Sequence, residues 1–263
     1  MRLVIHSDYE RLSRWAAEYI AGRINSFNKN KPFVIALPTG STSLGVYREL
    51  IKIHKEGKLS FENVRTFNLD EYCGLPPDHP QSYRYFMMDN FFNHIDIDPQ
   101  HIHLFDGLAK DPDKECKNYE EAIAAEGGIE LFWGGMGTDG HIAFNEPGCS
   151  LASRTRVEVL AMGTKTANAR FFDNDPNKVP QKAFTMGVGT AMDAQEIIIL
   201  SNGRAKARAL ATIVEGGVNQ MWPLSCLQMH PNAMIICDDD ATEELKVGTV
   251  KYFKDIEKGT INN

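Results

Sequence analysis

The sequence lacks the features that draw a protein onto nucleic acid or into a membrane. Its 28 Lys and Arg residues are outnumbered by 35 Asp and Glu residues, which gives a formal net charge of −7. A chain without a basic surplus has no general attraction for a phosphate backbone or for anionic lipid. No window approaches about 18 consecutive apolar residues, and the charged N-terminus, MRLVIHSDYERLSRW, lacks the apolar centre of a signal peptide. We therefore expect a cytoplasmic protein with no nucleic-acid or membrane partner.

Cysteine is scarce, and neither cysteine nor histidine occurs at a metal-binding spacing. The cysteines are odd in number, widely separated and without a C-x-x-C pair; they are Cys73, Cys116, Cys149, Cys226 and Cys237. Such thiols are ordinarily reduced in a cytoplasmic protein. His101 and His103 alternate in a short stretch, but no third ligand accompanies them. We expect no metal site.

Extremes of composition are absent as well. Hydrophobic residues make up 43% of the chain and charged residues 24%, close to the averages for globular proteins. These values disfavour intrinsic disorder and coiled coils. A chain of 263 residues is longer than the commonest domain, but single α/β domains of this order are ordinary. We expect one domain over residues 1–263.

What the sequence does contain is an alternation of short apolar runs with amphipathic segments. Residues 8–27 place apolar side chains at helical spacing, and Ser7 or Asp8 can cap the start of this helix. Further helices are expected at 44–55, 112–126, 203–215 and 241–257. Strands are expected at 33–38, 64–69, 130–133, 197–201 and 233–237, with 3–5 and 183–186 as additional candidates. The alternation predicts the α/β class, with an open, mostly parallel sheet covered by helices on both faces.

Four of the expected strands run directly into polar clusters. The clusters are TGSTS at 39–43, DEY at 70–72, GGMGTDGH at 134–141 and NGRAK at 202–206. In open parallel sheets, ligands bind beyond the carboxyl ends of the strands. We therefore expect the four clusters to converge on one pocket.

Residues 156–182 interrupt the alternation and show no convincing period. The turn-rich stretch DNDPNKVP lies within them at 173–180. A long irregular insertion beside a site is a candidate lid, and we place this lid at 156–185. A plain surface loop fits the same sequence equally well.

The cluster at 39–43 offers hydroxyls and free backbone N–H groups just ahead of a helix, which suits a phosphate. It is not the nucleotide P-loop, because the Gly-Lys-Ser/Thr ending is missing. An ordinary strand-to-helix turn capped by Ser or Thr is the alternative. Lys206 favours the phosphate interpretation, since an ammonium near the start of another helix can neutralise the same anion.

The glycine-rich cluster lacks the third glycine of a dinucleotide site. Instead it brings Asp139, His141 and Glu146 within eight residues of one another. Carboxylates around one imidazole raise its pKa and fix its tautomer, which suits proton transfer near neutral pH. Asp70 and Glu71 are adjacent after a strand, so one of them is expected to enter the pocket, and the residues alone leave open which one.

Six stretches together make the chain resemble the glucosamine-6-phosphate deaminase family along essentially its whole length. They are LPTGSTS at 37–43, FNLDEYCGL at 67–75, GGMGTDGHIAFNEPG at 134–148, SRTR at 153–156, ARFFDND at 169–175 and SCLQMHP at 225–231. The resemblance implies a Rossmann-like sheet and a cofactor-free enzyme of amino-sugar catabolism. It also implies the reaction, which converts glucosamine 6-phosphate and water to fructose 6-phosphate and ammonia.

The resemblance also assigns roles to individual residues. Asp70 is similar to the general base that moves a proton from C2 toward C1, and His141 to the group that opens the sugar ring. Asp139 and Glu146 are expected to hold and tune His141. The implied phosphate contacts are Gly40, Ser41, Thr42, Arg170 and Lys206. Because Arg170 lies on the expected lid, lid closure and substrate binding are expected to be coupled.

Many members of that family are hexamers activated by N-acetylglucosamine 6-phosphate, and a homohexamer is implied here. Residues of this sequence that match the family's activator site are Met1, Ser150, Arg156 and Tyr252. The sequence departs from the family at Cys149, where a serine is usual, and at Glu158, where the pattern has lysine. An anion in place of a phosphate-facing cation exchanges attraction for repulsion, so we expect weak or absent activation. The alternative is that Glu158 simply faces solvent.

Two other functions are compatible with a sugar-phosphate site. A 6-phosphogluconolactonase shares the fold and a phosphorylated sugar but hydrolyses an ester. A non-catalytic sugar-phosphate sensor of the kind found in transcription regulators needs a DNA-binding module, and no helix-turn-helix is recognisable in this sequence.

Overall fold

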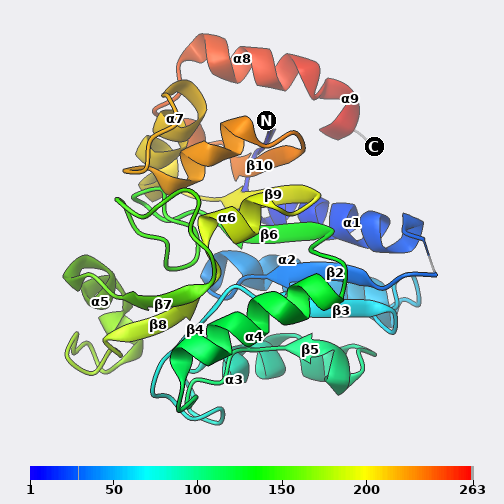
Figure 1. The fold of residues 1–263 in the computed structure, drawn as a ribbon. Coiled ribbons are helices and arrows are strands. Elements are labelled where there is room, and N and C mark those ends of the chain that lie inside the picture. The colour runs from blue at the N-terminus through cyan, green and yellow to red at the C-terminus, as the bar shows by residue number, and fades with distance from the viewer. Residues whose placement is uncertain (29, 262–263) are drawn as a thin grey trace.

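Among residues 1–28 and 30–261, which the computed structural model describes, seven parallel strands form the central sheet (Figure 1). Their order is β1-β10-β9-β6-β2-β3-β5, and every neighbouring pair is parallel. The strands are β1 (Arg2–His6), β2 (Phe33–Leu37), β3 (Val64–Asn68), β5 (Ile102–His103), β6 (Leu131–Gly135), β9 (Glu196–Ser201) and β10 (Ala233–Asp238). The predicted α/β class and the open parallel sheet are confirmed.

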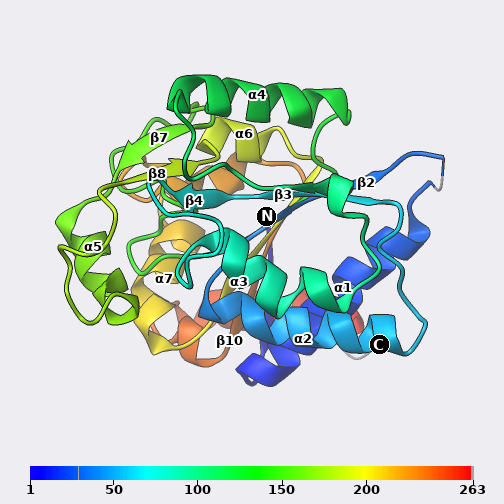
Figure 2. The ribbon, with the colours of Figure 1, turned by 90° about the horizontal axis from the view of Figure 1, so that it is seen from below.

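Helices cover both faces of this sheet (Figure 2). One face packs against α1 (Tyr9–Ser26), α2 (Ser41–Lys55) and α3 (Tyr83–Asn90). The other packs against α4 (Pro112–Ala125), α6 (Val188–Met192), α7 (Ala207–Glu215) and α8 (Val247–Ile256). The other described helices are α5 (Met162–Asn168), α9 (Lys258–Ile261) and the 3₁₀ helices η1 (Phe92–His94), η2 (Pro99–His101), η3 (Ala169–Phe171), η4 (Arg204–Lys206), η5 (Pro223–Met229) and η6 (Asp240–Thr242). None of the helices within the described ranges combines the length and the apolar character that crossing a bilayer requires.

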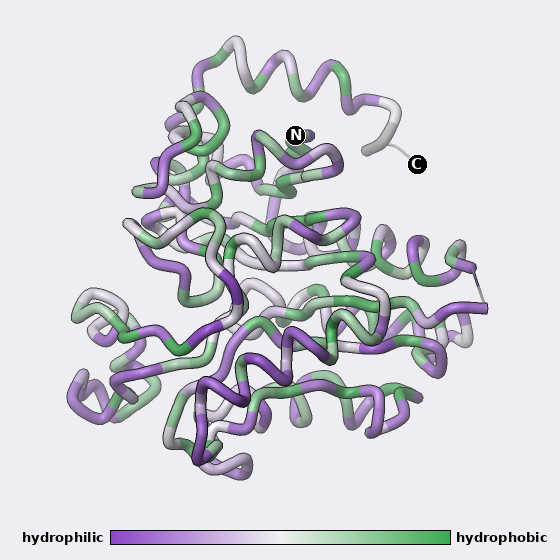
Figure 3. The backbone as a smooth tube through the Cα atoms, viewed as in Figure 1, coloured by the Kyte–Doolittle hydropathy of each residue, from purple (hydrophilic) through white to green (hydrophobic). Residues whose placement is uncertain are grey.

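The period of two along each strand divides its side chains between the two faces. On β2, Val34 and Ala36 pack into the cluster beneath α4, whereas Phe33, Ile35 and Leu37 pack into the cluster beneath α1 and α2. All five are buried, which is why β2 reads as a continuous apolar run in the sequence. Figure 3 shows the same run of hydrophobic residues along the central strands.

Most element boundaries agree with the predictions, and the exceptions occur at helix starts. Asp8 caps α1, because its carboxylate accepts a hydrogen bond from the Arg11 amide at 2.8 Å. The helix α2 begins at Ser41, so the expected turn at 39–43 is too long and its second half is the first turn of the helix. The expected helix at 241–257 is α only from Val247 to Ile256, preceded by the 3₁₀ turn η6.

A second, antiparallel sheet was not predicted as such. It has the order β4-β8-β7 and consists of β4 (Asp70–Tyr72), β8 (Lys182–Thr185) and β7 (Arg156–Val159). Between β7 and β8 the chain forms α5 (Met162–Asn168) and η3. The expectation that 156–182 is irregular is therefore wrong. The candidate strand at 183–186 corresponds to β8, whereas the partly exposed β7 has no apolar period strong enough to be recognised in the sequence. A small apolar cluster packs in this region; it contains Tyr72, Phe144, Leu160, Phe172 and Val179.

The order of the strands reverses between β2 and β6. From β2 the chain continues outward to β3 and β5, and from β6 it continues in the opposite direction to β9 and β10. A crevice forms beyond the carboxyl ends of the strands at such a reversal. The segments that leave this point are 38–43 after β2 and 136–146 after β6. Both predicted loops therefore leave the sheet where α/β proteins bind ligands.

Candidate active site

The helix α2 starts at the strand-order reversal, and no side chain caps its first turn. Gly40 is the N-cap residue, and its φ of 96° is in the region that glycine adopts without strain. The hydroxyl of Tyr9 donates to the carbonyl oxygens of Ser41 and Thr42 at 3.1 and 3.0 Å and so holds the turn. Free N–H groups at the positive end of a 15-residue helix favour a bound anion.

Lys206 lies near both Asp139 and Arg170. Burial lowers the pKa of Lys206, the Asp139 carboxylate raises it and the Arg170 guanidinium lowers it further, so the net shift is downward. Arg170 belongs to η3, between β7 and β8, and its guanidinium lies over the Phe171 ring at 4.7 Å from the centroid. Two predicted phosphate contacts from different segments are therefore close enough to influence each other.

One contact joins the loops after β2 and β9. The hydroxyl of Thr42 bonds to the Asn202 side-chain oxygen at 2.9 Å. Asn202 was not predicted as a site residue. Its place directly after β9, in the cluster NGRAK, was the available signal, but nothing in that cluster singles out the amide. With this bond, the start of α2 and the segment carrying Lys206 form one surface.

His141 is held by Asp139. Its Nδ1 lies 2.6 Å from the Asp139 carboxylate, and its backbone N–H donates to the same oxygen at 3.3 Å. Burial opposes ionisation of Asp139, but the hydrogen bond from His141 prevails and lowers the pKa of Asp139. The ionised acceptor places the proton on Nδ1, which leaves Nε2 as the nitrogen that exchanges a proton with a ligand.

Glycine at position 137 makes room for this imidazole. A β-carbon on Gly137 lies only 2.2 Å from His141 Nδ1, far inside contact distance. The Gly140 backbone has a φ of 76°, and a β-carbon there lies 2.9 Å from the Trp222 ring. The glycines of this loop therefore shape the turn around His141.

Glu146 does not contact His141, contrary to the prediction that it holds and tunes this histidine. One of its oxygens accepts a hydrogen bond from the Ala161 amide at 3.2 Å, and the other bonds to the Thr164 hydroxyl. Ala161 is the N-cap residue of α5. Both oxygens of Glu146 are thus engaged at the start of the helix between β7 and β8, where a carboxylate stabilises free N–H groups.

Asp70 and Glu71 have different surroundings, and the difference separates their roles. Asp70 is 8% exposed, and its Oδ1 has no hydrogen-bond partner within the described part of the chain. Burial, and then the neighbouring Glu71 carboxylate, raise the pKa of Asp70 well above its ordinary value. A buried carboxylate without a partner is costly to a fold and is typical of a functional group.

Glu71 has structural partners instead. Its carboxylate accepts hydrogen bonds from the backbone amides of Tyr72, Tyr83 and Arg84 at 2.8 to 2.9 Å. The last two amides are the first of α3, so Glu71 stabilises the start of that helix. Burial raises the pKa of Glu71, and these amides partly offset the rise. The residues alone left the choice open, and the contacts favour Asp70 as the pocket carboxylate.

The residues matched to an activator site are scattered over different surroundings. Arg156 donates from Nε to Glu158 at 2.8 Å, and its Nη2 lies 2.6 Å from the same oxygen. Glu158 therefore does not simply face solvent. Tyr252 lies on α8 with 61% of its surface exposed, and Met1 is half-buried. Cys149 is a free, half-buried thiol whose pKa is raised by burial.

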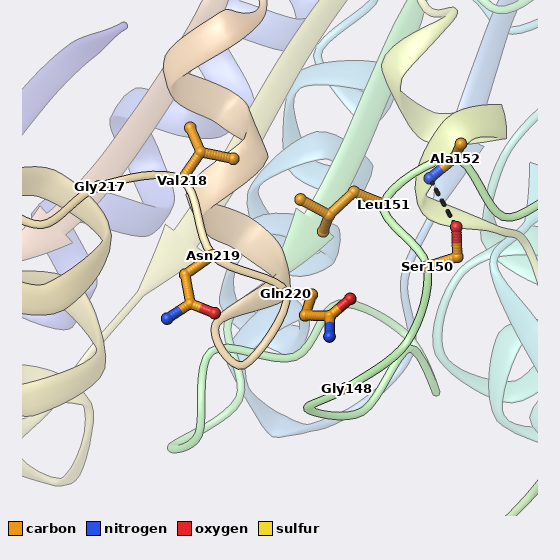
Figure 4. A pocket seen from close by; sticks show the side chains of 8 residues that line it. All are labelled: Gly148, Ser150, Leu151, Ala152, Gly217, Val218, Asn219 and Gln220. Carbon is orange, nitrogen blue, oxygen red and sulfur yellow. Dashed lines mark hydrogen bonds between the residues drawn. The ribbon is translucent and has the colours of Figure 1, made fainter.

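Ser150 lines an open depression of about 820 Å³ between segments 148–152 and 217–220 (Figure 4). Its hydroxyl accepts a hydrogen bond from the Ala152 amide at 3.2 Å. Leu151 and Val218 face across the same depression from opposite segments. The residues that line this depression are uncharged, whereas the site around Lys206 contains charged side chains.

The two alternating histidines lie away from this site. His103 stacks on Phe67 with a centroid distance of 4.2 Å, and burial lowers its pKa. Within the described ranges, no group of three or more His, Cys, Asp or Glu side chains is arranged to hold a metal ion.

The chain matches the family model described as glucosamine-6-phosphate isomerases/6-phosphogluconolactonase over residues 7–236. It is 59% identical to a glucosamine-6-phosphate deaminase of Phocaeicola vulgatus, over 99% of this chain and 100% of the relative. It is 60% identical to a glucosamine-6-phosphate deaminase of Treponema denticola, over 99% of this chain and 97% of that one.

Solved structures show the same fold. One described as a monomeric glucosamine-6-phosphate deaminase superposes with a TM-score of 0.88 at 40% identity, over 93% of this chain and all of that chain. A 6-phosphogluconolactonase from Trypanosoma cruzi superposes with a TM-score of 0.74 at 21% identity, over 93% and 97% of the two chains. The second likeness concerns the fold alone.

Proposed function

The chain belongs to the family of glucosamine-6-phosphate isomerases and 6-phosphogluconolactonases, and from this premise we propose that it converts glucosamine 6-phosphate and water to fructose 6-phosphate and ammonia. Relatives named as deaminases are 56 to 60% identical over nearly the whole chain, whereas the lactonases among the solved structures are 16 to 21% identical. The buried, unbonded Asp70 carboxylate is the single observation that carries the mechanism.

The proposed reaction needs one group that works on carbon and one that works on oxygen. Asp70 removes the C2 proton of the open-chain amino aldose and returns it to C1, which converts the C1 aldehyde to an alcohol and the C2 amine to an imine. Its raised pKa makes it a stronger base than an exposed aspartate. His141 exchanges a proton with the ring oxygen through Nε2 while Asp139 stabilises the imidazolium. Water then adds at C2, and the amine leaves as ammonia.

The substrate's phosphate is proposed to bind at the start of α2. The backbone of Gly40, Ser41 and Thr42 provides uncapped N–H groups, and Lys206 provides a cation from the neighbouring segment. Arg170 supplies a second cation from the segment 156–185. We propose that this segment is the lid and that the domain extends over residues 1–263.

Substrate assays separate the deaminase from its alternatives. Purified protein is mixed with glucosamine 6-phosphate, and ammonia is measured by a coupled dehydrogenase assay. The same protein is mixed with 6-phosphogluconolactone, and acid release is followed. We expect ammonia release and no acceleration of lactone hydrolysis. The opposite pattern indicates the lactonase, and a sugar-phosphate sensor shows binding with neither reaction.

The remaining proposals concern the cell and the assembly. We propose a cytoplasmic enzyme that forms a homohexamer, in keeping with the family's usual state. One solved relative is described as monomeric, so the mass of the purified protein is the deciding measurement. Light scattering of the purified protein distinguishes a mass near six times 29.5 kDa from the mass of one chain.

A further inference from the structure

The residues that follow His141 form a tight turn in an uncommon conformation. Ala143 has a φ of 50°, in the left-handed region that costs a non-glycine residue about 1 kcal/mol. The turn is closed by Asn145, whose backbone N–H donates to the Ile142 carbonyl at 2.9 Å. The Asn145 side chain donates to the same carbonyl at 2.9 Å. Two hydrogen bonds from one residue therefore hold the strained turn beside His141.

The Asn145 side chain also reaches out of the turn. Its Nδ2 donates to the Met186 carbonyl at 2.7 Å, and its Oδ1 accepts from Arg156 Nη1 at 2.8 Å. Asn145 is 1% exposed, so water is not available to replace these partners. The oxygen and the nitrogen of the amide therefore form hydrogen bonds with different segments of the chain.

The outer partners lie at the two ends of the proposed lid. Arg156 is the first residue of β7, and Met186 follows the last residue of β8. Everything between them is the hairpin with α5 and η3. A single buried amide thus connects the entry and the exit of the lid to the turn next to His141.

We propose that Asn145 is a positioning residue that keeps the His141 turn in register with both ends of the lid, an inference that rests on the proposed deaminase function. A shift of the lid at Arg156 or Met186 pulls on the amide that closes the turn. The imidazole is then displaced relative to the ring oxygen it serves. Asn145 does not touch the substrate in this scheme and acts through the turn.

The chemistry of the side chain accounts for the choice of asparagine. Ile142 and Met186 present carbonyl oxygens and need a donor, whereas Arg156 is a cation and needs an acceptor. Aspartate keeps the acceptor but sets a carboxylate against two carbonyl oxygens. Alanine removes all three side-chain hydrogen bonds in a buried place, which is destabilising, and leaves each segment only its own remaining partner: the Asn145 backbone N–H for Ile142, the Thr185 hydroxyl for Met186 and Glu158 for Arg156.

Glu120 offers a matched control, because it holds the same end of the lid without reaching the turn. Its carboxylate, on α4, accepts hydrogen bonds from the Thr155 amide at 2.9 Å, from Arg154 Nη2 at 2.5 Å and from the Thr190 hydroxyl. Removing its charge loosens the chain just before β7. No contact of Glu120 involves residues 141–145.

The kinetic experiment compares N145D, N145A and E120Q in ammonia release from glucosamine 6-phosphate. For the two Asn145 variants we expect kcat to fall by about 100-fold, as expected for misplacement of a reacting group. We expect KM to change by less than about threefold, because the phosphate contacts are untouched. E120Q should keep kcat within about twofold while its melting temperature falls. A kcat for both Asn145 variants as high as that of E120Q overturns the proposal.

Hydrogen exchange of the ligand-free proteins tests the coupling independently of activity. Exchange should accelerate in N145A at 142–146, 156–159 and 182–186 together, and in E120Q only near 153–156. Acceleration in N145A limited to 142–146 overturns the connection to the lid. If the wild-type protein releases no ammonia, the proposed function fails, and the exchange pattern still decides whether Asn145 joins these segments. N145D provides the same measurement if N145A does not fold.

Discussion

The parallel sheet and the outer strand β7 of the antiparallel sheet are stabilised in different ways. Every residue of β9 and β10 is buried, whereas no residue of β7 is buried. Polar contacts hold the region of β7, as in the pair of Arg156 with Glu158 and the bonds of Arg154 to Glu120 and Asp193. Apolar burial fixes a structure at large cost to any rearrangement, while exposed ion pairs contribute little and exchange readily with water. The parallel sheet therefore forms the rigid part of the site, which we call the floor. The segment from β7 to β8 rearranges at lower cost, and we call it the cover.

Asp70 lies where the two sheets meet, and its replacement should have the largest effect. Asp70→Asn keeps the shape and removes the base, so kcat should fall about 10³-fold with little change in substrate affinity. The measurement is ammonia release together with substrate binding by calorimetry. Because the base must be ionised, kcat/KM of the wild type should rise with pH through the raised pKa of Asp70. Near-normal turnover by the variant refutes the assignment.

Truncation in the two sheets should separate their contributions to stability. Ile199→Ala in the buried strand β9 should lower the free energy of unfolding by about 2 to 5 kcal/mol. Val159→Ala at the 65% exposed end of β7 should change it by about 0.5 kcal/mol or less. Chemical denaturation measures both. Equal losses would contradict the distinction between floor and cover.

The secondary structure was predicted more accurately from the sequence in the parallel sheet than in the antiparallel sheet. The strands β2, β6, β9 and β10 were predicted nearly to the residue, because burial on both faces leaves continuous apolar runs bounded by polar turns. The strand β7 carries mixed residues and was expected to be irregular, whereas β8 coincides with the candidate strand at 183–186. The pairing of β8 with β4 joins residues at least 111 positions apart, Tyr72 with Ala183 being the nearest in sequence, which no local pattern records.

Within the site, the sequence likewise predicted a contact between residues close in the chain but missed contacts between distant segments. The pairing of Asp139 with His141 was predicted, since two residues of separation in a glycine-rich turn bring the side chains together. Glu146 is only five residues from His141, but its partners Ala161 and Thr164 belong to the proposed lid. Proximity in the sequence suggested the wrong contact. Asn202 and Asn145 were missed because neither asparagine has a distinctive spacing, and only the folded structure supplies their partners.

The two side chains proposed to bind the phosphate come from the two different parts of the site. Lys206 follows the fixed strand β9, and Arg170 belongs to the cover. We expect Lys206→Met to raise KM by about 30-fold and Arg170→Met by about tenfold, because an exposed cation contributes less than a half-buried one. Steady-state kinetics with glucosamine 6-phosphate measures both. A larger effect of Arg170 would place the main phosphate contact on the lid.

The smallest expected effect concerns activation by N-acetylglucosamine 6-phosphate. Glu158 binds Arg156 through Nε and Nη2, so a carboxylate of the chain already occupies donors that an external phosphate would need. We expect the half-saturation concentration of glucosamine 6-phosphate to change by less than about twofold when this ligand is added, compared with the larger coupling typical of allosteric enzymes. The measurement is a substrate titration with and without the ligand.

Glu158→Lys is the matched variant for this prediction, since it releases Arg156 and adds a second cation beside it. The variant should gain sensitivity to N-acetylglucosamine 6-phosphate if Glu158 is what blocks the site. Activation of the unmodified protein would show that the Arg156–Glu158 pair opens when the ligand binds. In that case the free energy of ligand binding exceeds the stabilisation that the partly exposed Arg156–Glu158 ion pair contributes, and the segment around β7 rearranges more readily than its contacts suggest.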